Sequence, residues 1–345
     1  MDYSKSKTKD NNETYKNFTA ALKAGSVSKF IILHGEERYL LEHSLGSLRT
    51  ILCPDGLDSF NYKRFDGKGI PVEELNEAIE TFPAFAERTL IEVHDFDIFA
   101  SPHRERMSEI LASLPDYVCV VFIYSTIEFK PDGRLKATKE VLKFAEVVEF
   151  NIQDKGKLIN WISKHFVDAG KSISPDDAEY LAYITGGLMT SLIGEIKKVA
   201  AFSKNERILR SDIDAVVTPV LDAVAYRLTD AIINRNHKRS IELLDELFQM
   251  REAPHKLIYS ISLKLRQLLA AKVCSDKGIG KTDFMNLCGI RFDIQARSLI
   301  DAARNTSIKK CRTYLLECCK TALELNSTAE PEARILELVV RLAVI

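Results

Sequence analysis

The chain has 345 residues, of which 46% are hydrophobic and 28% are charged, as in ordinary folded globular proteins. At about 100–200 residues per domain, this length predicts two or three domains. The 48 Lys and Arg residues and 49 Asp and Glu residues give a formal net charge of -1, which argues against a protein that holds nucleic acid mainly through its own surface.

The first part of the chain alternates predicted strands with predicted helices. Short runs typical of strands lie at 30–33, 61–65, 90–93, 117–124 and 147–150. Between them, apolar residues recur at helical spacing at 39–48, 72–80, 104–114 and 135–144. Pro71 is expected at the first position of the second of these helices. Strands that alternate with helices predict a mostly parallel sheet covered on both faces.

After residue 151 the strand patterns stop and helical patterns follow one another. Three of them, at 158–166, 175–184 and 192–200, predict a compact three-helix unit. Ser174 is a good capping residue for the second helix, with Pro175 at the first helical position and Asp177 at the third. Gly186 and Gly187 are expected to end this helix.

The remainder of the chain is predicted to be helical almost throughout. Six helices are expected, at 221–234, 240–248, 255–273, 294–303, 308–325 and 332–343. Their many apolar positions predict a bundle that buries much of each helix or contacts partner subunits. The expected fold class is therefore α/β followed by all-α.

Neither secretion nor a membrane span is predicted. Residues 1–10 are polar and charged, unlike a signal peptide, and no stretch approaches the ~18 apolar residues of a membrane span. The seven cysteines include no C-x-x-C pair, and their odd number indicates reduced thiols rather than a disulfide framework or a metal site. We expect a cytoplasmic protein with no metal and no cofactor.

The turn after the first strand stands where a phosphate-binding loop would lie. Such a loop needs Gly-x-x-x-x-Gly-Lys-Ser/Thr, because backbone N–H groups cradle the phosphates and the Lys side chain reaches them. Here Gly35 is followed by Glu36 and Glu37, two carboxylates that would repel phosphate. Nucleotide binding at this degenerate loop is not expected.

Other catalytic signals are also missing. Asp95 follows the third strand, where an ATPase carries its magnesium-binding acid, but Phe96 replaces the adjacent water-activating Glu. We interpret Asp95 as a loop-capping residue. The seven His residues are scattered singly, and neither H-E-x-x-H nor G-x-S-x-G occurs. The sequence therefore argues against an active site of its own.

From residue 30 to the end, the order of these features resembles the delta subunits of bacterial DNA polymerase III. FIILHGEERYLLEHSLGSLR resembles the family's opening strand, turn and helix. ETFPAFAERTLIEV is similar to its stretch of small and apolar residues, Phe, a basic residue and a strand. LINWISKHFVDAGKSISPDDAEYLAYITGG resembles its lid domain, and RILELVVRL its closing helix.

The resemblance implies an AAA+-like parallel-sheet domain, related to P-loop NTPases, at 28–151. A helical lid would follow at 152–216 and a helical collar for oligomerisation at 217–345, after a flexible segment and short helix at 1–27. It implies a subunit that binds and opens the sliding clamp (beta) for loading onto primed DNA, with no enzymatic activity of its own. Implied partners are the ATPase subunits (gamma or tau) and delta prime in a hetero-pentamer, and primed DNA through the assembled complex, with no membrane.

The resemblance also places a clamp-binding tip after the helix at 72–80. Carried onto this chain, the tip is Phe82, Pro83, Ala84, Phe85 and Ala86, with Arg88 behind it. A buried aromatic anchor commonly contributes ~2 kcal/mol or more to binding, and Pro83 would stiffen the tip. Ala84 stands where relatives often have Leu, so Phe82 or Phe85 must carry more of the contact. The structural alternative is a Phe-rich turn that only closes the core.

Two other function classes stay open. An NTPase with an unusual loop would bind ATP as an isolated chain. A helical adaptor or scaffold on a degenerate NTPase fold, unrelated to replication, would have no affinity for a sliding clamp.

Overall fold

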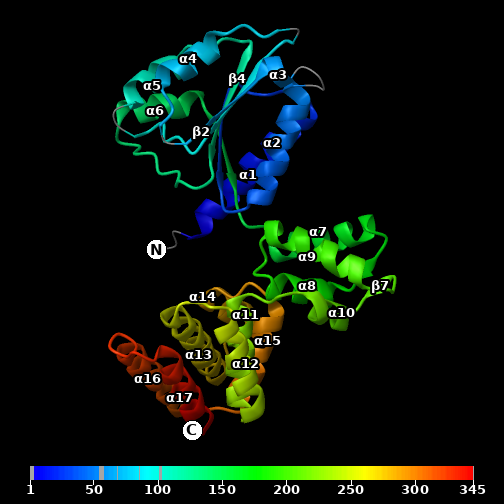
Figure 1. The fold of residues 1–345 in the computed structure, drawn as a ribbon, viewed down its shortest axis with the longest axis vertical. Helices are drawn as coiled ribbons and strands as arrows, with labels where there is room; N and C mark the ends of the chain where they lie inside the picture. Colours follow the sequence, from blue (N-terminus) through cyan, green and yellow to red (C-terminus); the bar gives the residue numbers. More distant parts are fainter. Residues whose placement is uncertain (1–3, 54–57, 68, 85, 101–102, 345) are drawn as a thin grey trace. The chain divides into compact units, whose positions relative to one another are not determined.

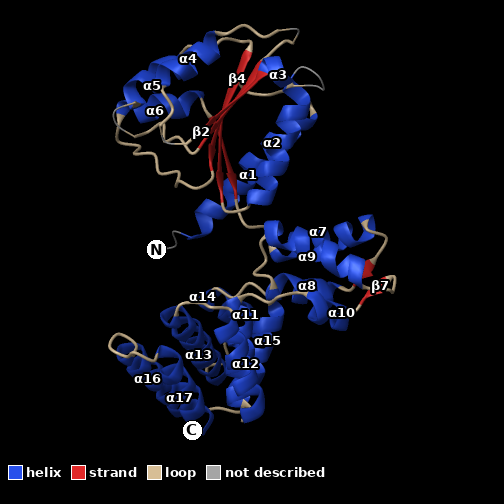
Figure 2. Cartoon of the chain, viewed as in Figure 1, coloured by secondary structure: helices blue, strands red, loops and turns tan. Residues whose placement is uncertain are grey.

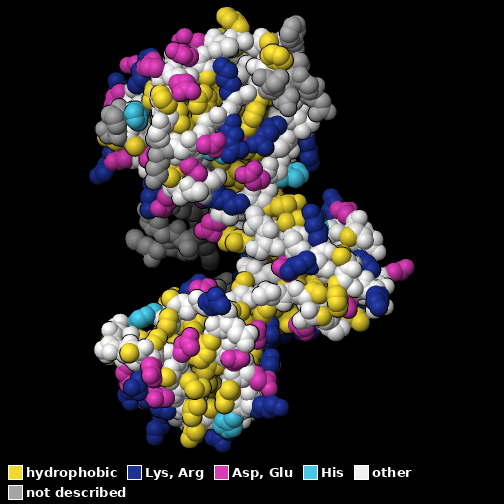
Figure 3. All heavy atoms as spheres, in the orientation of Figure 1, with side chains coloured by type: hydrophobic (Ala, Val, Ile, Leu, Met, Phe, Trp, Pro, Cys, Tyr) yellow, Lys and Arg dark blue, Asp and Glu magenta, His cyan; other side chains and the backbone are white. Residues whose placement is uncertain are grey.

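The computed structural model describes residues 4–53, 58–67, 69–84, 86–100 and 103–344. It divides into two compact units, Met1–Gln153 and Asp154–Ile345 (Figure 1). Within the described ranges, no helix is long and apolar enough to cross a membrane. On the face drawn in Figure 3, side chains of both charge signs are interspersed over each unit, in keeping with the balanced composition.

The N-terminal unit is built on a five-stranded parallel sheet, as predicted. Its strands are β1 (Phe30–Gly35), β2 (Tyr62–Asp66), β3 (Thr89–His94), β4 (Val118–Tyr124) and β5 (Glu146–Phe150). They lie in the order β2-β3-β4-β1-β5, and every neighbouring pair is parallel. All residues of β3 and β4 are buried. Strand β4 accordingly reads as a continuous apolar run in the sequence, whereas β3 also carries the buried polar residues Thr89, Glu92 and His94.

Helices cover both faces of this sheet (Figures 1 and 2). The helices are α1 (Ser4–Lys23), α2 (Arg38–Leu52), α3 (Asp58–Asn61), α4 (Val72–Glu80), α5 (Arg104–Ala112) and α6 (Lys136–Phe144). Strand β1 shows the two faces directly, because successive side chains of a strand point to opposite sides. Ile31 and Leu33 pack with α1 and α2, whereas Phe30 and Ile32 pack with α4, α5 and α6.

Two details of this unit differ from expectation. Helix α1 spans 20 residues, longer than the short helix expected, because Phe18 and Leu22 are buried against the sheet and α2 and stabilise a polar sequence. Pro71 precedes α4 instead of occupying its first position. Its backbone is extended, and its carbonyl accepts the hydrogen bond from Leu75 N–H at 3.2 Å.

The second unit begins with a small helical group. Its elements are α7 (Lys155–Asp168), β6 (Ser172–Ile173), α8 (Pro175–Ile184), α9 (Met189–Phe202), β7 (Arg207–Ile208) and α10 (Arg210–Val216). The Ser174 hydroxyl accepts from Asp177 N–H at 3.1 Å, which confirms the predicted cap. Gly186 and Gly187 follow α8 with positive φ angles, as expected of a helix end. The two-residue strands β6 and β7 were not predicted, because so short a pair leaves no periodic pattern.

A helical bundle completes the second unit, as the apolar patterns predicted. It contains α11 (Leu221–Ile233), α12 (His237–Gln249), α13 (Pro254–Asp276), α14 (Lys281–Cys288), α15 (Asp293–Arg304), α16 (Ile308–Glu324) and α17 (Pro331–Val344). Helix α13 packs against α11, α15 and α16, and its buried residues Ile261, Leu265 and Leu268 belong to the bundle core. Helix α14 was not predicted, because it has only eight residues.

Candidate functional site

The turn between β1 and α2 is shaped by contact with β5. Gly35 has φ 130°, and a Cβ atom there would lie 2.4 Å from the carbonyl oxygen of Phe150. The next turn residue, Glu36, is exposed, whereas Glu37 is buried and its backbone N–H donates to Phe150 O at 2.9 Å. Glycine is therefore required at position 35 for the close approach of two strands, independently of any phosphate.

Replacing Gly35 with Ala is expected to lower the free energy of unfolding by about 2 kcal/mol or more, because a side chain there is both strained and in collision with backbone. Chemical denaturation measures this change. The matched control is Gly46→Ala, within α2, where an added Cβ meets nothing within 4 Å. That change should stabilise the chain by about 0.5–1 kcal/mol. Equal effects of the two substitutions would contradict the account of this turn.

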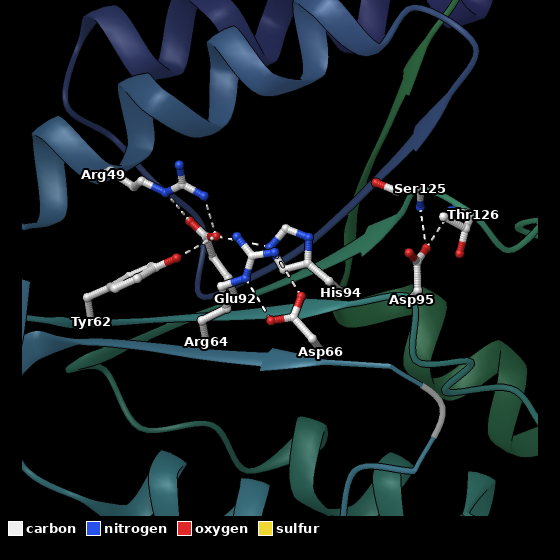
Figure 4. Close-up of polar contacts among 9 residues, drawn as sticks. All are labelled: Arg49, Tyr62, Arg64, Asp66, Glu92, His94, Asp95, Ser125 and Thr126. Carbon is white, nitrogen blue, oxygen red and sulfur yellow. Dashed lines mark hydrogen bonds and ion pairs between the residues drawn. The ribbon is translucent and has the colours of Figure 1, made fainter.

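Open α/β sheets bind their ligands at the carboxyl ends of the strands. In this chain, polar groups at these ends are hydrogen-bonded to one another. Arg38, the first residue of α2, donates from Nη1 to Tyr124 O at 2.8 Å and from Nη2 to Ser125 O. Asp95 Oδ1 accepts from the N–H groups of Ser125 at 2.6 Å and Thr126 at 2.7 Å (Figure 4). Burial opposes ionisation of Asp95, but these hydrogen bonds hold its pKa below the ordinary value. The interpretation of Asp95 as a loop-capping residue is confirmed.

An aromatic cluster covers the end of β1. The ring of Phe129 stacks on His34 with centroids 4.3 Å apart and meets the rings of Phe99 and Tyr124 edge-on. Burial lowers the pKa of His34 to about 4, so this side chain is neutral near pH 7. Among the residues that the structure describes, no group of three His, Cys, Asp or Glu side chains is arranged to hold a metal ion.

A buried charge network joins α2, β2 and β3 (Figure 4). The Glu92 carboxylate is fully buried and accepts two hydrogen bonds from Arg49, at 2.7 and 2.6 Å. It also accepts from Tyr62 Oη at 2.9 Å and lies 3.1 Å from His94 Nε2. Burial acts to raise the pKa of Glu92, but hydrogen bonds from His94, Arg49 and Tyr62 and the charge of Arg49 bring it below its ordinary value. These contacts hold α2, β2 and β3 together, so the network has a structural role.

The predicted tip begins where α4 ends. Thr81 N–H donates to Glu77 O at 3.1 Å, and the described residues from there to β3, which are 81–84 and 86–88, belong to no helix or strand. Phe82 is 76% exposed. Its ring stacks on Tyr117, with centroids 4.7 Å apart and an angle of 30° between the planes. The structure therefore places Phe82 on the surface, supported on one side by a second ring.

The other predicted tip residues are placed differently from Phe82. Pro83, Ala84 and Ala86 are half-buried, and Phe85 lies outside the described residues. Arg88 is also half-buried, and its Nη1 donates to Val27 O at 2.7 Å. This bond ties the end of the loop to the segment before β1, so Arg88 acts within the fold as well as lying behind the tip.

One residue that the sequence analysis did not select contacts the tip directly. The Asn61 side chain, at the end of α3, donates from Nδ2 to Ala84 O at 2.7 Å and accepts from Ala84 N–H at 2.7 Å. Asn61 is fully buried. The sequence pattern predicts Asn61 as the first residue of a strand, and no local pattern signals a partner 23 residues away in the sequence.

Comparisons with known proteins identify one family. Residues 31–151 match the family model of the DNA polymerase III delta subunit, and residues 222–341 match that of the C-terminal domain of this subunit. The DNA polymerase III subunit delta of Bacillus subtilis is 24% identical over 92% of this chain and 93% of its own length. The probable delta subunit of Aquifex aeolicus is 23% identical over 76% of each chain.

A solved structure agrees in fold over nearly the whole chain. The Bacillus subtilis DNA clamp loader delta protein superposes with a TM-score of 0.55 at 22% identity, over 96% of this chain and 100% of that one. The Thermotoga maritima RuvB Holliday junction branch migration motor gives a TM-score of 0.41 at 15% identity, over 64% of this chain and 75% of that one.

Proposed function

Since this chain belongs to the delta-subunit family of DNA polymerase III and is a clamp-loader subunit with an AAA+-like fold, we propose that it binds the sliding clamp and opens the ring for loading onto primed DNA. The observation that carries this proposal is the exposed ring of Phe82 on a braced loop. A large apolar side chain held on a surface is suited to a pocket on a partner protein.

The loop around Phe82 is held in one conformation, as a binding tip needs to be. Tyr117 supports the ring, Asn61 holds the backbone of Ala84 and Arg88 anchors the end of the loop. A loop already held in one conformation loses less conformational freedom on binding, so more of the contact energy is available as affinity.

Opening the ring further requires a difference in affinity. A ligand that binds the closed and open clamp equally shifts no equilibrium between them. The tip must therefore bind the distorted clamp interface more tightly than the closed one. We place this subunit in a cytoplasmic hetero-pentamer with the ATPase subunits gamma or tau and with delta prime, in which the helical collar assembles the subunits and primed DNA is met by the whole complex. ATP bound by the partner subunits would expose the tip, and hydrolysis would withdraw it.

Release of clamps from circular DNA tests opening separately from binding. A clamp loaded on nicked circular DNA leaves only when its ring opens. The purified chain should speed this release without any nucleotide, and the Phe82→Ala chain should not. A wild-type chain that binds the clamp but leaves the release rate unchanged would contradict the opening step and leave the binding step intact.

The second part of the proposal is that the chain neither binds nor hydrolyses ATP. Two observations support it. Arg38 donates hydrogen bonds to the carbonyl groups of Tyr124 and Ser125 at the carboxyl end of β4, and Phe129 stacks on a neutral His34 at the end of β1. We expect no saturable ATP binding in calorimetry up to about 1 mM, the upper end of ordinary substrate affinities, with the ATPase subunit of the same clamp loader as the positive control. Saturable binding by the isolated chain would support the NTPase alternative.

A further inference from the structure

The buried side chain of Asn61 is hydrogen-bonded to the backbone of the tip at Ala84. We infer that Asn61 is a positioning residue for clamp binding, because its carboxamide fixes the backbone of Ala84 and thereby presents Phe82 in one orientation. This inference rests on the proposed function, since it concerns how the same tip meets the clamp.

The geometry is that of a matched pair of hydrogen bonds. Asn61 Nδ2 donates to Ala84 O and Asn61 Oδ1 accepts from Ala84 N–H, each at 2.7 Å. One side chain thus satisfies both backbone groups of a loop residue, in the way that a paired strand would. Among common side chains only an amide offers a donor and an acceptor side by side in this form. An Asp at position 61 would retain the acceptor and place an oxygen against the Ala84 carbonyl.

Asn61 is itself firmly held. It is fully buried, and its own carbonyl accepts a hydrogen bond from the Cys53 thiol at 3.4 Å. Strand β2 begins at the next residue, Tyr62, so the position of Asn61 is set by the sheet. The two bonds therefore fix Ala84 to the end of the sheet, although the described residues of this loop, 81–84 and 86–88, belong to no helix or strand.

A purely structural role for Asn61 would have different consequences. If Asn61 only stabilised the unit, its removal would lower the stability of the whole chain without any special effect on the tip. If it positions the tip, its removal should weaken clamp binding through Phe82, and the effect should disappear when the Phe82 ring is absent. The comparison of single and double variants separates the two roles.

The experiment measures binding of the full chain to the sliding clamp of its own organism. We expect Asn61→Ala and Asn61→Asp each to weaken binding about tenfold, since the loop must then be ordered during binding. In the Phe82→Ala background, Asn61→Ala should add little further loss. The matched control is Asp95→Ala, which removes another side chain that holds a loop backbone, at the opposite end of β3. This control should bind like the wild type.

Hydrogen exchange of the wild-type chain gives a second test that needs no variant. The Ala84 amide should be protected although it lies in a loop, whereas the amide of the exposed Glu87 should exchange rapidly. Three outcomes would overturn the inference while leaving the proposed function standing. They are unchanged clamp binding in both Asn61 variants, additive losses of clamp affinity in the double variant, and rapid exchange of the Ala84 amide. Failure of the folded wild-type chain to bind the clamp would remove the function itself.

Discussion

Replacing Phe82 with Ala is expected to weaken binding to the sliding clamp about 30-fold, the equivalent of the ~2 kcal/mol that a buried aromatic anchor commonly contributes. Phe82 is 76% exposed in the free chain, so truncating its ring opens no cavity in the core. The loss should therefore be seen in the clamp affinity, measured by calorimetry or surface plasmon resonance, while the free energy of unfolding falls by no more than the roughly 0.5–1.5 kcal/mol of the lost stacking on Tyr117.

Phe144→Ala is the matched control for this substitution. Phe144 is also an exposed phenylalanine of the N-terminal unit, at 53%, but it lies at the end of α6. Its replacement should leave clamp binding as in the wild type. Equal weakening by both substitutions would indicate a general effect of surface hydrophobicity, and no weakening by Phe82→Ala would move the contact to another surface of the chain.

Replacing Glu92 with Gln should lower the free energy of unfolding by about 3 kcal/mol, the lower end of the range for breaking a buried ion pair. The lower end applies because the Arg49 side chain is 38% exposed and can be partly hydrated in the variant. Gln keeps the size of Glu but removes the charge that faces Arg49, and its amide group cannot accept as many of the surrounding hydrogen bonds. Urea denaturation at neutral pH measures the change. The Glu73→Gln variant, whose partner Arg106 is also on the surface, should show no comparable loss.

The same network has a predictable pH dependence. The folded chain holds the pKa of Glu92 below its ordinary value of 4.5, so the network contributes its stabilisation above that value and loses it as the pH falls through the folded pKa. The difference in unfolding free energy between the wild type and Glu92→Gln should therefore shrink in acid. A difference that stays constant from neutral pH to about pH 3 would contradict the linkage between the pKa shift and stability.

The sheet of the N-terminal unit was predictable because its strands and helices obey simple patterns. Strand β4 is buried on both faces and is an apolar run, and the buried strand β3 carries the apolar residues Leu90, Ile91 and Val93. Helix α4 has the predicted bounds because its buried face repeats at helical spacing. Helix α1 was underestimated because its sequence is mostly polar and its length depends on the burial of Phe18 and Leu22 against other elements. Such stabilisation by tertiary contacts leaves little local signal.

The site was predictable only in part. The resemblance implies a tip at residues 82–86 with Arg88 behind it, but apolar composition alone favours a buried Phe82. Only the structure places its ring on the surface beside Tyr117. The partners of Asn61 and Glu92 come from other elements of the fold. No spacing rule in a single sequence connects residues that meet only after the sheet has formed.

Binding of the purified chain to the sliding clamp of its own organism, in the absence of nucleotide, decides whether this chain contacts the clamp through Phe82. We expect a stable complex whose affinity is the same with and without ATP and falls when Phe82 is replaced by Ala. A folded wild-type chain that forms no complex with the clamp would contradict the account and favour a helical adaptor on a degenerate NTPase fold.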